Sequence, residues 1–224
     1  RSLLVFSGKD GTKIDELAPL QDGEDIVLYN VAPDIDEDGF TDIVGLHNVK
    51  HVPHARFYSS RDFSPLSEMF PLPVQMRPTV YECADLNGDR FPDIALVHHT
   101  GGKPEGSLLV ALSGKDGQEL WRVNGTEVEG GAQIVVVDAK NEKTVGAYRD
   151  VKFADSLAVL PDINGDNIPE VATGHTDFFD REKKIAGCVF IFSGSNGQLL
   201  KSVASPNNTR RIGVSVTPFA DINL

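Results

Sequence analysis

A nine-residue acidic segment occurs three times in this sequence without a gap, and this repeat limits the folds that the chain can adopt. The copies run over residues 34–42 (DIDEDGFTD), 85–93 (DLNGDRFPD) and 162–170 (DINGDNIPE), and a further copy begins at Asp221. Apolar runs of strand length precede and follow each complete copy. A segment that recurs in this way indicates a repeat architecture, in which each copy belongs to one supersecondary unit.

A second repeated segment is a tight turn between two apolar runs. Residues 6–11 (FSGKDG), 112–117 (LSGKDG) and 192–197 (FSGSNG) share the pattern, and residues 58–62 (YSSRD) are a degraded copy. Asp-Gly and Asn-Gly in this setting predict hairpin turns, because these residues accept the positive φ that such turns require. Turns and acidic segments alternate along the chain. Each unit is therefore expected to read strand, acidic loop, strand, connection, strand, turn, strand.

The same alternation predicts the fold class. No stretch carries a sustained apolar period of 3.6 residues, so no helix is expected. Four-stranded units that recur every ~50 residues are typical of propeller blades. We predict an all-β fold, a β-propeller of four-stranded antiparallel blades, with three to four blades present as part of a ring of six to eight. Residues 1–224 then form one partial propeller, divided into the end of a blade at 1–22, blades at 23–75, 76–126 and 151–204, an inserted hairpin or loop at 127–150, and the start of a further blade at 205–224.

The insertion follows from one irregular interval. The distance along the chain from each turn to the next acidic loop is 27 residues (7 to 34), 26 (59 to 85) and 28 (193 to 221), but it is 49 residues between 113 and 162. The extra residues fall between Trp121 and Phe153. They are interpreted either as a hairpin that decorates one blade or as a binding loop, since insertions in repeat proteins often gather on one face.

The acidic segments have the composition of calcium loops. Carboxylate or amide oxygens stand at positions 1, 3, 5 and 9, and a backbone carbonyl at position 7 can complete a set that converges on one ion. Calcium takes about 6–8 oxygen ligands. The predicted ligands are Asp34, Asp36, Asp38, Phe40 (carbonyl) and Asp42 in the first loop; Asp85, Asn87, Asp89, Phe91 (carbonyl) and Asp93 in the second; and Asp162, Asn164, Asp166, Ile168 (carbonyl) and Glu170 in the third.

The alternative is that Asp, Asn and Gly are here only turn-forming residues. Three gapless copies with an acid at positions 1, 5 and 9 each time favour calcium, with about three ions expected. The chain has 21 basic and 33 acidic residues and a net charge of −12. This balance argues against nucleic acid as a partner, because nucleic-acid binders carry clustered Lys and Arg. No apolar run reaches the ~20 residues of a membrane helix, so no membrane insertion within this chain is expected.

These loops, each followed by an apolar strand, resemble the FG-GAP repeat, the blade of the integrin α-subunit propeller and of many secreted bacterial proteins and some lectins. The resemblance spans the chain, although Phe-Ser-Gly stands for the Phe-Gly of the family and Gly174-His175-Thr176 for its Gly-Ala-Pro. It implies calcium between the first two strands of a blade, and an extracellular, cell-surface or periplasmic location. The remainder of a longer propeller is a further implied partner.

The function expected from this resemblance is a module that binds an extracellular protein or glycan, as in adhesion. Two alternatives remain: a lectin, or the scaffold of a secreted carbohydrate-active enzyme such as a polysaccharide lyase. A lyase needs a basic catalytic residue, for which Arg149, Lys152, Arg210 and Arg211 are the candidates. No nucleophile elbow, catalytic-cysteine signature or phosphate loop occurs.

Three smaller features leave alternatives open. His47, His98 and His175 each fall 13 residues after the first Asp of a loop, and are interpreted as a polar repeat position rather than a ring of ligands. Cys83 and Cys188 are interpreted as buried thiols, with a disulfide as the alternative. Trp121, the only tryptophan, is expected in core packing or in a contact.

Overall fold

The computed structural model of the 224-residue chain describes residues 3–17, 24–73, 80–98, 108–124, 156–180, 185–204 and 212–218. Its strands are β1 (Leu3–Phe6), β2 (Lys13–Leu17), β3 (Glu24–Ala32), β4 (Asp42–Val49), β5 (Val52–Tyr58), β6 (Phe70–Pro71), β7 (Val80–Ala84), β8 (Asp93–His98), β9 (Leu108–Leu112), β10 (Glu119–Asn124), β11 (Ser156–Leu160), β12 (Glu170–Asp180), β13 (Ile185–Phe192) and β14 (Leu199–Ala204). A search of the described residues finds no helix with the length and apolar character needed to cross a membrane.

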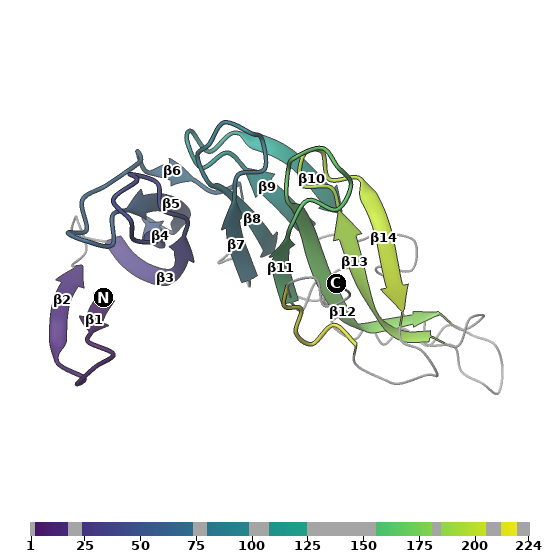
Figure 1. Ribbon diagram of the computed structural model, residues 1–224, viewed down its shortest axis with the longest axis horizontal. Helices are drawn as coiled ribbons and strands as arrows, with labels where there is room; N and C mark the ends of the chain where they lie inside the picture. The colour runs from purple at the N-terminus through teal and green to yellow at the C-terminus, as the bar shows by residue number, and fades with distance from the viewer. Residues whose placement is uncertain are drawn as a thin grey trace. The chain divides into compact units, whose positions relative to one another are not determined.

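The strands form four antiparallel sheets in which neighbours along the chain are neighbours in space (Figure 1). β1 and β2 form a two-stranded sheet. Three four-stranded sheets follow, in the orders β3-β4-β5-β6, β7-β8-β9-β10 and β11-β12-β13-β14. Each acidic loop joins the first and second strands of its sheet. The predicted fold class, all-β with four-stranded antiparallel blades, is confirmed, and the number of blades in a complete ring stays a prediction.

The chain divides into two compact units. Unit 1 comprises residues 1–77 together with 114–117, and unit 2 comprises residues 78–113 and 118–224. The first acidic loop lies in unit 1, and the second and third loops lie in unit 2. The predicted insertion at 127–150 lies outside the described residues.

A core cluster of unit 2 draws on both of its sheets. Alternate residues of β8 (Ala95, Val97) and β9 (Leu109, Ala111) pack with Val171 of β12 and the aromatic residues of β13. Alternation of this kind is expected because successive side chains of a strand point to opposite faces. Its buried members are Ala84, Leu86, Ala95, Val97, Leu109, Ala111, Trp121, Val123, Leu157, Val171, Cys188, Phe190 and Phe192.

Trp121 of β10 links the two sheets of unit 2. It is 7% exposed, and its indole N–H donates to the carbonyl of Gly194, in the turn between β13 and β14, at 2.5 Å. A buried Trp N–H generally requires such a partner. The expectation that Trp121 serves in packing is confirmed.

The hairpin turns share one geometry, including the degraded copy. The N–H of the turn serine donates to the carbonyl five residues later at Ser7, Ser59, Ser113 and Ser193, over 2.8–2.9 Å. Four residues after the serine, three copies have a glycine at positive φ, whereas the degraded copy has Phe63 at φ 57°. This position is unfavourable for a bulky side chain. Phe63 packs against the buried Tyr58, and this packing offsets part of the cost.

Candidate metal sites

The three acidic loops have the same backbone course. Positive φ recurs at positions 4 and 6 of every loop, at Glu37 and Gly39, at Gly88 and Arg90, and at Gly165 and Asn167. Only one of the two positions is glycine in each copy, and the other is Glu, Arg or Asn. Because positive φ is uncommon outside glycine, its recurrence at equivalent positions establishes that the sequence repeat is also a structural repeat.

Backbone N–H groups hold the first acid of each loop in place. Asp34 accepts from Asp38 and Gly39 at 3.1 and 2.9 Å. Asp162 accepts from Gly165 and Asn167 at 2.7 and 2.8 Å. In the second loop, Asp85 accepts from Gly88, Asp89 and Arg90 at 2.6–3.2 Å.

The side chains at positions 3 and 5 are bound in the same manner. Position 3 accepts from the N–H of position 5, as in Asn164 from Asp166 at 2.9 Å. Position 5 accepts from the N–H of position 7, as in Asp38 from Phe40 at 2.9 Å and Asp166 from Ile168 at 2.9 Å. The same two bonds recur in all three loops.

The ninth acid is buried at the base of each loop. Asp42, Asp93 and Glu170 are 1%, 0% and 0% exposed. In each copy one oxygen accepts the N–H of position 2, from Ile35, Leu86 and Ile163, at 2.7–2.8 Å. Burial of a carboxylate is costly unless it is paired or binds a metal. The partner of the second oxygen of each acid therefore determines whether that oxygen is available to a metal ion.

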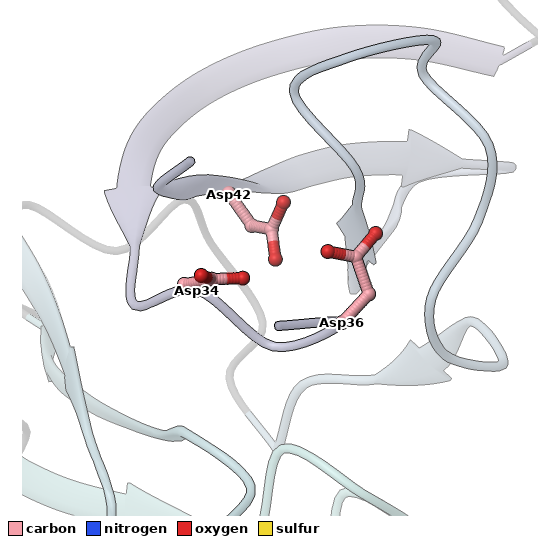
Figure 2. Close-up of side chains that lie close together, drawn as sticks. All are labelled: Asp34, Asp36 and Asp42. Atoms are coloured by element: carbon pink, nitrogen blue, oxygen red, sulfur yellow. The ribbon is translucent and has the colours of Figure 1, made fainter. Parts of the chain in front are cut away.

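In the first loop three carboxylates converge. The oxygens of Asp34, Asp36 and Asp42 lie within 4.8 Å of one another. Figure 2 shows these side chains directed toward a common space, Asp34 and Asp36 from the loop and Asp42 from the start of β4. The second oxygen of Asp42 accepts the N–H of Ser60, from the turn after β5, at 3.2 Å.

The third loop gathers Asp162, Asp166 and Glu170 within the same 4.8 Å. Here the second oxygen of Glu170 has no hydrogen-bond partner among the described residues, although it is buried. Burial raises the pKa of Glu170 above its ordinary value, and repulsion from Asp162 and Asp166 raises it further. Such an arrangement favours a bound cation, which would supply the charge that the protein does not provide.

The second loop differs. Asp85, Asp89 and Asp93 do not form a comparable cluster in the part of the chain that the structure describes. The side-chain amide of Asn87 donates to the second oxygen of Asp93 at 3.4 Å. The positive-φ positions and the backbone hydrogen bonds of this loop nevertheless repeat those of the other two loops.

Nine of the fifteen predicted ligand residues lie outside these two clusters, and their roles as ligands stay predictions. Asp38 and Asn164 accept bonds within their own loops, and the ligand roles of the Phe40, Phe91 and Ile168 carbonyls stay predictions. Sequence reasoning missed the contribution of the hairpin turns. Ser195, in the turn after β13, donates to Asp166 at 2.9 Å. The strict alternation of turns and acidic loops was the signal that could have indicated this proximity.

The repeated histidines are buried on the second strand of each sheet. His47, His98 and His175 are 1%, 2% and 0% exposed. His47 shares a hydrogen bond of 2.9 Å with the hydroxyl of Tyr58. Burial lowers the pKa of His98.

The remaining candidates are placed as follows. Cys83 and Cys188 are not joined in a disulfide, and burial raises the pKa of the Cys188 thiol. The basic residues considered for a lyase, Arg149, Lys152, Arg210 and Arg211, lie outside the described residues.

Comparison with known proteins gives structural matches only. Neither a protein-family model nor a curated protein matches the chain. Among solved structures, the rhamnogalacturonan lyase YesW is similar at 14% identity and a TM-score of 0.46, over 89% of this chain and 42% of that chain. The exotype rhamnogalacturonan lyase YesX is similar at 14% identity and a TM-score of 0.45, over 89% and 40%. The chain therefore spans less than half of the length of these structures.

Proposed function

We propose that this chain is a calcium-binding propeller segment of the FG-GAP type, in which each acidic loop holds one Ca²⁺. The observation that carries the proposal is the unpartnered, buried oxygen of Glu170, a residue whose carboxylate lies with those of Asp162 and Asp166 in the third loop. A buried carboxylate oxygen without a donor costs about 1–3 kcal/mol or more. A hard cation that takes oxygen ligands removes this cost.

The chain's own residues divide into two roles toward the ion. Asp42, Asp93 and Glu170 would hold it from the buried base of each loop, where strand and loop meet. The acids and amides at positions 1, 3 and 5 would close over it from the exposed side. Bound calcium supplies positive charge, which relieves the repulsion among these acids and ties the first strand of each blade to the second.

Calorimetric titration of the chelator-treated protein with Ca²⁺ tests this proposal. About three sites are expected, with the affinity of extracellular modules, on the order of 10⁻⁴–10⁻³ M, or tighter. Absence of binding heat, together with an unchanged melting temperature on adding EDTA, would leave the acidic segments as turns only.

We further propose that this calcium-binding scaffold serves as an extracellular or cell-surface module that binds a protein or a glycan. The support is the blade architecture together with the loop motif. A glycan array and a screen of extracellular proteins, each run with the calcium-loaded chain and repeated in EDTA, test it. Cleavage of a uronate polymer, followed by ultraviolet absorbance, tests the alternative of a lyase scaffold, and any turnover by this chain would exclude a pure binding role.

A further inference from the structure

The turn between β13 and β14, residues 193–198, contacts both the third acidic loop and β10 within unit 2. Its Ser195 hydroxyl donates to Asp166 of the third loop at 2.9 Å. Its Gly194 carbonyl accepts the indole N–H of Trp121 at 2.5 Å. The turn thus contacts a predicted metal ligand on one side and the only tryptophan of the chain on the other.

The turn is packed too closely to move freely on either side. A methyl group at Gly194 would collide with the carbonyl of Pro169, which precedes Glu170, and would lie 2.9 Å from Leu86 of the second loop. A methyl group at Gly197 would lie 2.8–2.9 Å from the indole ring of Trp121. A displacement of the third loop is therefore transmitted to the indole, because tightly packed groups do not absorb small shifts.

Ser195 is the polar link in this arrangement. Asp166 uses one oxygen for the N–H of Ile168 and the other for the Ser195 hydroxyl and the Asn164 amide. Ser193, which is buried, shares a 2.9 Å hydrogen bond with Ser195 and holds it toward the loop. The corresponding turn residue is Lys9 or Lys115 in the other complete turns. A hydroxyl that orients a ligating carboxylate is a group on which metal affinity depends.

We propose that Ser195 couples calcium binding at the third loop to the docking of Trp121 on turn 193–198. This inference rests on the proposed calcium function and specifies how one of its sites is regulated. Calcium fixes the Asp166 carboxylate, Ser195 follows the carboxylate, and the turn then presents the Gly194 carbonyl to the indole. The coupling is reciprocal, so docking of Trp121 strengthens calcium binding at this loop by the same factor.

Tryptophan emission reports the coupling directly, because the chain has one tryptophan. Chelation of calcium is expected to shift the emission of the wild type to longer wavelength, as the indole becomes more exposed to water, and addition of Ca²⁺ is expected to reverse the shift. The D162N/D166N variant, which removes the third site, is expected to lose the calcium response of the emission while calorimetry still detects the other sites.

The variants of Ser195 test its role as the link. S195A is expected to bind calcium at the third loop about tenfold more weakly, and to lose most of the change in emission even at saturating calcium. S195T retains the hydroxyl and is expected to restore the response. S202A, which changes an exposed serine on β14, is the matched control and keeps the wild-type response.

The outcomes separate this inference from the proposed function. Absence of any calcium heat in the wild type overturns the calcium function itself. Binding of about three ions with an emission that does not respond overturns the coupling and leaves the calcium function standing. A full emission response in S195A overturns Ser195 as the link.

Discussion

Glu170 differs from the other two ninth-position acids because its second oxygen has no donor among the described residues. Burial is the main cause of its raised pKa. The charged form is therefore disfavoured in the calcium-free fold and required in the calcium-bound one. The two states should respond in opposite directions to removal of this charge.

We expect E170Q to be at least as stable as the wild type in EDTA and to lose the share of calcium stabilisation that belongs to the third loop. With calcium one hundredfold above the dissociation constant, one site contributes about 2.7 kcal/mol to the free energy of unfolding. Urea denaturation with and without calcium measures both effects. E68Q, at an exposed glutamate outside the loops, is the control. An undiminished calcium increment in E170Q would contradict the assignment of Glu170 as a ligand.

His98 provides a prediction on pH. Burial lowers its pKa in the folded state, so the unfolded chain binds more protons below the ordinary value of about 6.5. The stability that depends on neutral His98 is present above pH ~6.5 and is lost as the pH falls below it, by at most about 1.4 kcal/mol per pH unit. Between pH 7.5 and 5.5, the free energy of unfolding should fall less steeply in H98Q than in the wild type. S202A, at an exposed residue that does not titrate in this range, is the control and should keep the wild-type slope.

The hairpin turns offer a matched comparison among the structural elements. Gly11 and Gly197 occupy the same turn position, at φ 74° and 71°. A methyl group at Gly11 has no neighbour within 4 Å, whereas one at Gly197 lies 2.8 Å from Trp121. G11A therefore carries only the conformational cost of positive φ, about 1–2 kcal/mol. The free energy of unfolding of G197A should fall by a further ~1–3 kcal/mol, because the added methyl group overpacks the contact with Trp121.

Thermal or urea unfolding of both variants measures this difference. Equal losses of stability in G11A and G197A would show that the methyl group at residue 197 fits beside Trp121 without overpacking. Combining W121F with each glycine substitution completes a double-mutant cycle. In the W121F background, the extra loss of unfolding free energy in G197A relative to G11A should be smaller, because the indole is gone.

The elements of this chain were largely predictable, and their contacts were not. Asp-Gly and Asn-Gly pairs, acidic segments and apolar runs mark where strands begin and end, because backbone preference is local. The pattern predicts even the degraded turn, although Phe63 rather than glycine occupies its position of positive φ. The Ser195–Asp166 bond spans 29 residues and depends on how a turn packs against a loop. No local pattern encodes such a contact.

Within the sites, the sequence predicted the loops but not the differences among them. The second and third loops share nearly the same ligand types, yet only the third gathers three carboxylates. Glu170 lies with two acids of its loop, whereas Asp93 accepts from the side-chain amide of Asn87. The first loop also ends in Asp and still gathers three carboxylates, so the side-chain rotamers account for the difference, and the motif does not encode them.

At the scale of the whole molecule, charge and the division into units act together. Three calcium ions would change the net charge of −12 to −6. The first loop belongs to unit 1, and the other two loops belong to unit 2. Because each loop joins the first two strands of its own sheet, calcium should stabilise each unit through its own loops.

Hydrogen exchange resolves this prediction strand by strand. Calcium should slow the exchange of amides on β4, β8 and β12, which follow the three loops. D34N/D36N should lose the calcium-dependent protection of β4 and keep that of β12, and D162N/D166N should do the reverse. The free energy of local opening governs such exchange, so the two variants report on separate units. If either variant removed protection from both strands equally, the units would unfold as one cooperative body, and calcium at any loop would stabilise the entire chain.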